Sequence, residues 1–317
     1  MKIYKTWRNY ILHESPLKPY INKISFLITF FIQSLGVFFD KINFTQMPKI
    51  EGGLKGSKGS KGSNVLWCSV CNDNYIPGLC VLLYSLKKHN PTFDYPFKIY
   101  YDDDISETNQ AKVRAYYKNV IFEKSEVFKN YAKWYNCLLP FKETGYDKVI
   151  CIDSDILCLG DISELNETDY TQFTACQDSN VKFMFQTHLN IRHFFDINSG
   201  IFIIPKTMLN NGVFQDLVNL AKKYAHEKLG DQDILNRYLK WSRTTRLPGK
   251  YNVKKNIYYN QNYKPSDDVR FLHFCGTDKP FLTRERTYIK TKNNLYLDGI
   301  YALYQSYMDE MGLEVCR

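Results

Sequence analysis

Residues 148–160 read KVICIDSDILCLG, an apolar run that is interrupted by two aspartates and then resumes. Asp153 and Asp155 lie two positions apart at the predicted carboxyl end of a strand, where both carboxylates can reach one hard divalent cation. A solvated turn is the plain alternative, since the pattern DxD is common by chance. Both flanks predict burial, however, and a buried acidic pair is costly without a counter-ion. We therefore predict a cation site at this turn.

Strand-like and helix-like segments alternate on both sides of this turn. A helix is predicted to begin at Pro77, because Leu79, Leu82, Leu83 and Leu86 form one apolar stripe, and another begins near Ser106. Apolar runs that predict strands occupy residues 65–71, 97–101, 120–122, 148–152, 173–176, 200–204 and 270–274. Such alternation predicts an α/β domain with a mainly parallel central sheet, which binds ligands beyond the carboxyl ends of its strands. A last amphipathic helix over 300–311 is expected to be a structural cap.

The chain is predicted to have three parts, which are residues 1–50, 51–64 and 65–317. Residues 24–39 (ISFLITFFIQSLGVFF) are apolar and follow a basic segment, which fits an uncleaved single-pass type II membrane anchor. The stretch is slightly short of the roughly 20 residues that a bilayer needs. A hydrophobic helix packed on the domain or lying on a membrane surface is the alternative, and a cytoplasmic location goes with the packed helix. Residues 52–63 (GGLKGSKGSKGS) predict a flexible linker.

The positive charge of the chain belongs to its N-terminal part. Residues 1–64 contain ten Lys and Arg against three acidic residues, which is seven of the nine net positive charges. A nucleic-acid-binding protein carries its charge on the folded domain, so we expect no nucleic-acid partner. The nine cysteines are odd in number and irregularly spaced, which predicts free thiols.

From about Val65 to Phe281 the chain resembles glycosyltransferase family 8, which includes glycogenin and bacterial lipooligosaccharide galactosyltransferases. Any one of the shared motifs is modest evidence, but together and in family order they are specific. The motifs are CNDNYIPG at 71–78, YAKW at 131–134, IDSDILCLGDISEL at 152–165, NSGIFIIP at 198–205 followed by GDQDILN at 230–236, and HFCGTDKPF at 273–281.

The resemblance implies a GT-A fold, which is a Rossmann-like nucleotide-sugar domain, with Mn²⁺ (or Mg²⁺) and a UDP-sugar donor. Asp153 and Asp155 would bind the metal, with Asp153 also near the ribose, and His273 would be the third ligand. A histidine in an apolar strand is more often a packed core residue. Its position before GxxKP favours the ligand role, and two carboxylates with one imidazole leave positions open for diphosphate oxygens.

By the same resemblance, five further residues would contact the nucleotide and its diphosphate. Asn72 and Tyr75 would contact the uracil and ribose, and Lys133 would reach the donor sugar or diphosphate. Gly276 would let the backbone approach the phosphates. Lys279 would neutralise them, which suits a compact point charge.

Four residues are implied beside the donor sugar. Asp231 and Gln232 would lie next to it, with Gln232 near the anomeric carbon, and Asn198 and Asp178 would also contact the sugar. Asp231 is in addition a candidate helix N-cap, and both roles can hold at once.

The implied activity is transfer of a hexose, glucose or galactose, from the UDP-sugar to a hydroxyl of a carbohydrate, glycoprotein or glycolipid with retention of configuration. Front-face attack and double displacement are both open, although Gln232 is a poor nucleophile. Three alternatives are a nucleotidyltransferase, an inactive nucleotide-sugar-binding protein and a self-glucosylating glycogenin-like primer. The first usually has a Gly-rich basic phosphate loop near its first strand, which is absent here.

Overall fold

The computed structural model describes residues 64–102, 105–131, 133–178, 196–225, 230–239, 244–255, 268–276, 278–282 and 294–313. All of them belong to one compact unit. Residues 1–63 lie outside the described residues, so the three-part organisation and the anchor at 24–39 stay predictions. Among the helices that are described, none is both long and apolar enough to cross a bilayer.

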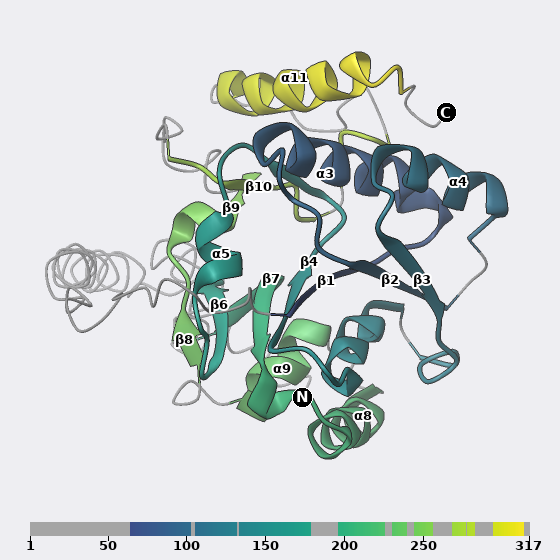
Figure 1. The fold of residues 1–317 in the computed structure, drawn as a ribbon, viewed down its shortest axis with the longest axis vertical. Coiled ribbons are helices and arrows are strands. Elements are labelled where there is room, and N and C mark those ends of the chain that lie inside the picture. The colour runs from purple at the N-terminus through teal and green to yellow at the C-terminus, as the bar shows by residue number, and fades with distance from the viewer. Residues whose placement is uncertain are drawn as a thin grey trace, which may run out of the picture. The chain divides into compact units, whose positions relative to one another are not determined.

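A seven-stranded sheet with the order β3-β2-β1-β4-β7-β6-β8 forms the centre of the molecule (Figure 1). Its strands are β1 (Val65–Val70), β2 (Phe97–Tyr101), β3 (Val120–Lys124), β4 (Lys148–Ile152), β6 (Phe173–Gln177), β7 (Ile197–Pro205) and β8 (Thr244–Arg246). The strands β3, β2, β1 and β4 are parallel, as are β6 and β8, whereas β7 is antiparallel to both of its neighbours. The prediction of an α/β fold with a mainly parallel sheet is confirmed.

Beyond β4 the chain enters a second sheet of three strands, in the order β5-β10-β9. These are β5 (Ile156–Cys158), β9 (Val253–Lys254) and β10 (Phe271–His273). The strand predicted at 270–274 therefore exists but lies outside the main sheet. Because β4 and β5 are separated only by residues 153–155, the acidic turn joins the two sheets.

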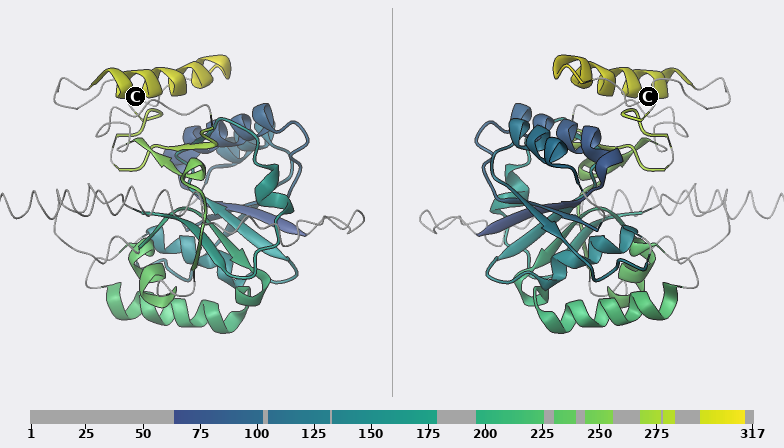
Figure 2. Two further views of the ribbon diagram at one scale, coloured as in Figure 1. Left: turned by 90° about the vertical axis from the view of Figure 1, so that its left-hand side faces the viewer. Right: turned by 90° about the vertical axis from the view of Figure 1, so that its right-hand side faces the viewer.

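Helices cover both faces of the central sheet (Figures 1 and 2). The longer helical segments are α3 (Ile76–His89), α4 (Glu107–Tyr116), η3 (Lys133–Lys142), α8 (Asn211–Tyr224), α9 (Asp231–Leu239) and α11 (Asn294–Glu310). Short ones are η2 (Asp73–Tyr75), α5 (Ser163–Glu167), η4 (Lys206–Met208) and η7 (Gly249–Tyr251). Alternate residues of β1 point to opposite faces: Trp67 packs in the apolar cluster with α3, and Leu66 packs in the cluster with η3, α8 and α9.

The helix α3 follows its sequence signals closely. Pro77 lies in its first turn, where a missing backbone N–H costs nothing, and the predicted leucine stripe is fully buried. The buried stripe fixes α3 against the sheet, and with it Asn72 and Tyr75, which directly precede the helix.

The C-terminal helix α11 packs on α3 and on the small sheet, as the prediction of a structural cap requires. Tyr304 and Met308 are fully buried in a cluster that includes Phe274 and Phe281, and the rings of Tyr304 and Phe274 lie 4.9 Å apart. Phe274 follows His273, so this packing holds the segment that carries the imidazole.

Substitutions at Tyr304 test this cap. Its buried hydroxyl has no hydrogen-bond partner among the described residues. Tyr304→Phe should therefore raise the free energy of unfolding by about 1 kcal/mol, whereas Tyr304→Ala should lower it by about 3–5 kcal/mol. Urea denaturation measures both, and Leu303→Ala, at a position that is 37% exposed on the same helix, is the control. Equal effects of Tyr304→Ala and Leu303→Ala would contradict the packing.

Candidate functional site

The acidic turn is clamped by backbone hydrogen bonds from both sheets. The N–H of Asp153 donates to the carbonyl of Gly200 in β7 at 2.8 Å, and the N–H of Phe274 donates to the carbonyl of Asp155 at 3.0 Å. The strand β4 that precedes the turn is buried along its whole length. The carboxylates of Asp153 and Asp155 are therefore positioned by a rigid backbone.

His273 lies beside both aspartates. It pairs with Ile156 in the antiparallel register of β10 and β5, one residue after the turn. Its Nε2 is 3.3 Å from Oδ1 of Asp155 and 3.5 Å from Oδ2 of Asp153. One ligand atom from each of the three residues lies within 4.8 Å of the others. The structure thus brings together the three residues that the sequence predicts to be metal ligands.

Lys279 supplies a positive charge at this cluster. Its buried ammonium forms an ion pair with Oδ2 of Asp155 and donates to the carbonyl of Phe274 at 2.9 Å. Burial alone would raise the pKa of Asp155, but His273 and Lys279 outweigh it and hold that pKa well below its usual range. Oδ1 of Asp155 is buried without a hydrogen bond among the described residues.

The pKa of Asp153 is shifted in the opposite direction to that of Asp155. Burial and the neighbouring Asp155 carboxylate raise its pKa to about 7, against the attraction of His273 and Lys279. The cluster therefore holds more negative charge than its neighbours neutralise. An orphaned carboxylate oxygen, a second carboxylate pushed toward protonation and an imidazole fit a divalent cation of the Mn²⁺ or Mg²⁺ type.

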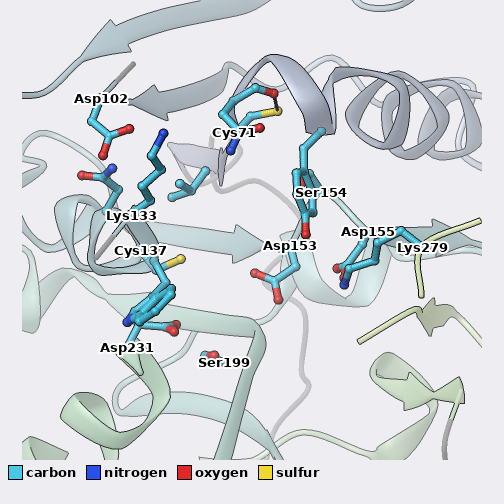
Figure 3. Close-up of a pocket in the computed structure, with 15 residues that line it drawn as sticks. Cys71, Asp102, Lys133, Cys137, Asp153, Ser154, Asp155, Ser199, Asp231 and Lys279 are labelled. Atoms are coloured by element: carbon cyan, nitrogen blue, oxygen red, sulfur yellow. Dashed lines mark hydrogen bonds and ion pairs between the residues drawn. The ribbon is translucent and has the colours of Figure 1, made fainter. Parts of the chain in front are cut away.

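A cavity of about 320 Å³ opens beside the cluster, beyond the carboxyl ends of β1 and β4 (Figure 3). It is lined by Val70, Cys71, Asn72, Tyr75, Asp102, Lys133, Trp134, Asn136, Cys137, Asp153, Ser154, Asp155, Ser199, Asp231 and Lys279. Seven of the predicted site residues are among them. Figure 3 shows the side chains of Asp153 and Asp231 entering this space from different elements.

The remaining predicted residues lie around this cavity but do not line it. Gly276 follows β10 with a φ of +87°, a left-handed conformation that favours glycine. Asp178 accepts hydrogen bonds from the side chains of Asn198 and Lys254, each at 3.0 Å. Gln232 lies in the first turn of α9, next to Asp231.

Asp231 and Cys137 form a further polar contact in the wall. Burial raises the pKa of the Asp231 carboxyl to about 6, although the Ser199 hydroxyl donates a hydrogen bond to it. Burial, followed by the Asp231 and Asp153 carboxylates, raises the pKa of the Cys137 thiol well above its usual value. Cys137 is therefore a neutral hydrogen-bond donor to Asp231 rather than a nucleophile.

Buried polar atoms without partners gather in this cavity. Oδ1 of Asn72 and both amide atoms of Asn136 are buried and have no hydrogen-bond partner in the described part of the chain. Asp155 contributes a third such group to the lining. Buried polar groups are normally paired, and leaving one unpaired costs about 1–3 kcal/mol. A bound ligand would supply the missing partners.

An amide network connects His273 to the residues beside the cavity. Nδ1 of His273 is 2.9 Å from Oδ1 of Asn252, whose amide nitrogen donates to Oδ1 of Asn198 at 2.6 Å. The amide nitrogen of Asn198 donates to Oε1 of Gln232 and to Oδ1 of Asp178, each at 3.0 Å. His273, Asn252 and Asn198 are buried, whereas Gln232 and Asp178 at the other end of the network are partly exposed.

Several of these residues were missed by reasoning from sequence. Asn252 precedes β9, a strand of only two residues, and Asn136 and Cys137 lie in η3 between apolar positions. The spacing of Lys133, Asn136 and Cys137, at i, i+3 and i+4, was the one signal that they share a helical face. Asp102, which directly follows β2, also lines the cavity.

The sequence of this chain is similar to those of known glycosyltransferase-family proteins. The model described as glycosyl transferase family 8 matches residues 68–284. General stress protein A of Bacillus subtilis (strain 168) is 28% identical over 181 residues, which cover 50% of this chain and 61% of that protein. Glycogenin-2 of Homo sapiens is 25% identical over 232 residues, which cover 66% and 42%. The chain thus spans less than two thirds of the length of either relative.

Two structures of LgtC, an active-site mutant and the galactosyltransferase in complex with donor and acceptor sugar analogues, superpose with TM-scores of 0.60 and 0.57. They are 20% and 18% identical, cover 77% and 76% of this chain, and are themselves covered to 95%. The fold is therefore the GT-A-like α/β fold of glycosyltransferases. With the family model matching most of its length, the chain belongs to glycosyltransferase family 8.

The two aspartates should respond oppositely to neutralisation in chelator-treated protein. Asp155→Asn leaves the buried Lys279 without its ion-pair partner and should lower the free energy of unfolding by about 3 kcal/mol. Asp153→Asn removes the crowded carboxylate and should stabilise the protein. Because the raised pKa of Asp153 costs wild type stability as pH rises toward and through about 7, this gain should be present at pH 8 and absent near pH 4.

Urea denaturation at the two pH values, with a chelator present throughout, measures these effects. Destabilisation by Asp153→Asn at pH 8 would contradict the excess of negative charge.

Gly200 should be essential for the position of His273. A Cβ at Gly200 would lie 2.4 Å from Cε1 and 2.5 Å from Nδ1 of the imidazole, so Gly200→Ala must displace the ring. We expect Mn²⁺ affinity to fall roughly 10-fold or more, with a stability loss of about 1–3 kcal/mol from overpacking. The control is Gly249→Ala, where a Cβ has nothing within 4 Å. Calorimetric titration with Mn²⁺ measures the affinity of each variant. An undiminished affinity in Gly200→Ala would contradict the close packing of the His273 ring against residue 200.

Proposed function

We propose that this protein is a retaining hexosyltransferase that transfers glucose or galactose from a UDP-sugar to a hydroxyl of a carbohydrate, glycoprotein or glycolipid acceptor. The observation that carries the proposal is the convergence of Asp153, Asp155 and His273 at the edge of a polar cavity. Membership of glycosyltransferase family 8 supports a transferase reaction.

In this proposal the cavity holds the donor, and Asp153, Asp155 and His273 hold a Mn²⁺ or Mg²⁺ ion. When bound, the ion would supply positive charge for the diphosphate that leaves the sugar. Lys279 adds a second positive charge at the same place, since its buried ammonium lies against Asp155. The left-handed backbone at Gly276 would allow the main chain to approach the phosphates without a side chain between them.

The nucleoside and the sugar would occupy different walls of the cavity. Asn72 and Tyr75 lie at the two ends of η2, just before α3, and Oδ1 of Asn72, which has no partner among the described residues, is an acceptor suited to a base or ribose. Lys133 and Asp231 enter from η3 and α9 on the other side and would bind the sugar hydroxyls. The carboxylate of Asp231 lines the cavity and can accept a hydrogen bond from a sugar hydroxyl.

Retention of configuration at the anomeric carbon follows directly if the acceptor attacks the face of the sugar from which the diphosphate leaves. The bond between the anomeric carbon and the phosphate oxygen breaks, the acceptor oxygen bonds to that carbon from the same face, and its proton passes to the departing phosphate oxygen. Oε1 of Gln232 accepts hydrogen bonds from Asn198 at 3.0 Å and from the N–H of Ser199 at 3.3 Å. That oxygen is thus engaged, which argues against Gln232 as a nucleophile and favours the front-face route.

A donor screen tests the proposal. UDP release should be measured with UDP-glucose, UDP-galactose and UDP-N-acetylglucosamine at saturating Mn²⁺, and one hexose donor should be turned over. Asp153→Ala should lower the rate by roughly 10³-fold, since the charge stabilisation at stake is several kcal/mol. Asp161→Ala is the control, because Asp161 lies in the same sequence motif but is exposed. Near-normal turnover by Asp153→Ala would refute the metal site.

Two other outcomes identify the alternatives. If no donor is hydrolysed or transferred although UDP binds, the protein is a nucleotide-sugar-binding protein without activity. If the intact mass of the protein itself increases by hexose units, it is a self-glucosylating primer, as the similarity to glycogenin-2 would allow.

A further inference from the structure

The amide network behind the cavity has a fixed direction. It runs from Gln232 through Asn198 and Asn252 to His273, with successive distances of 3.0, 2.6 and 2.9 Å. Each amide can in principle be turned by 180°, which exchanges its donor and its acceptor. The direction must therefore come from groups whose donor character cannot change.

Two backbone N–H groups of β7 provide that anchor. The N–H of Gly200 donates to Oδ1 of Asn198 at 3.0 Å, and the N–H of Ser199 donates to Oε1 of Gln232 at 3.3 Å. A backbone N–H can only donate, so both side chains must present oxygen at these positions. The amide nitrogen of Asn198 then necessarily faces Gln232 and Asp178, where it donates to oxygens.

The orientation of Asn252 follows from that of Asn198. Since Oδ1 of Asn198 is an acceptor, Asn252 must turn its amide nitrogen toward it, and its own Oδ1 then faces Nδ1 of His273. An amide oxygen can only accept, so Nδ1 carries a hydrogen. In a neutral imidazole the other nitrogen, Nε2, then has its lone pair free, and Nε2 is the atom that faces Asp153 and Asp155.

We propose that Asn252 is a positioning residue that holds His273 in the Nδ1–H tautomer, with Nε2 ready to bind a cation between the two aspartates. This inference rests on the metal site of the proposed function. Histidines that bind metals usually donate their second N–H to an oxygen, which fixes the ring and its tautomer. Here that oxygen is an amide whose direction is set by the backbone of Ser199 and Gly200.

Because these side chains are buried, each of them depends on its protein partner for its hydrogen bond. His273 is 3% exposed, Asn252 5% and Asn198 8%, so no bulk water can replace a lost partner. The other tautomer would bring two acceptors together, Nδ1 of His273 and Oδ1 of Asn252, and would place Nε2–H between the carboxylates. Such a ring would neutralise the aspartates by hydrogen bonding instead of joining them as a ligand.

The first experiment reads the tautomer directly in chelator-treated protein. Two-dimensional NMR of ¹⁵N-labelled imidazoles, recorded at rising pH until the ring of His273 carries a single hydrogen, shows which ring nitrogen holds it. His273→Gln assigns the resonances. Wild type should show a protonated Nδ1 and an unprotonated Nε2 at His273. Asn252→Asp keeps an oxygen acceptor and should keep this tautomer, whereas Asn252→Ala should lose it.

The second experiment is a calorimetric titration of the same proteins with Mn²⁺ alone. Asn252→Ala should bind Mn²⁺ roughly 10- to 100-fold more weakly, and Asn252→Asp should retain most of the affinity. Asn210→Ala is the matched control, because Asn210 caps α8 through Val213 and its loss should leave both the tautomer and the affinity unchanged.

The proposal is overturned if the singly protonated ring of His273 in wild type carries its hydrogen on Nε2, or if Asn252→Ala keeps both tautomer and affinity. If Asn252→Ala does not fold, loss of the Nδ1–H tautomer in Asn252→Asp also overturns it. Failure of the proposed function looks different: wild type would then bind no Mn²⁺, while the NMR result would still decide the role of Asn252.

Discussion

Two carboxylates held side by side by the backbone are the constraint around which this structure is built. The turn that carries Asp153 and Asp155 cannot relax, since its N–H and carbonyl groups are bonded to both sheets. Two neighbouring side chains, His273 and Lys279, lie against these carboxylates. Lys279 and His273 hold the pKa of Asp155 down, whereas burial beside Asp155 raises that of Asp153.

The topology explains how residues so distant in sequence meet at this turn. The antiparallel strand β7 runs beside β4, which brings Asn198 and Gly200 to the acidic edge of the sheet. The short strand β10 pairs with β5 directly after the turn and delivers His273. A glycine at position 200 is required because the imidazole packs within van der Waals contact of the strand backbone. The site thus depends on one strand that runs against the direction of its neighbours.

The sequence predicts the parts of this structure whose signals are local. Leucine spacing in α3, apolar runs in β1 to β4 and the interrupted run at 148–160 identify elements directly, and the family resemblance adds the long-range convergence of His273 with the aspartates. The small sheet was not foreseen, because strands of two or three residues have no periodicity to detect. Asn252 and Asn136 were missed for a related reason. An asparagine in a loop or a helix usually serves turns or solvent, and only its neighbours in space reveal another role.

The ion pair between Lys279 and Asp155 would couple the two binding events of the proposed function, that of the cation and that of the diphosphate. Oδ2 of Asp155 cannot bind both the Lys279 ammonium and a divalent cation at full strength. A divalent cation that enters the site would therefore compete with this ammonium. An anionic group of a ligand can draw the ammonium away and release the oxygen. Because such coupling is reciprocal, the divalent cation and the anionic group would each strengthen the binding of the other. The protein would consequently take up cation and anion together, as a neutralised pair, more readily than either alone.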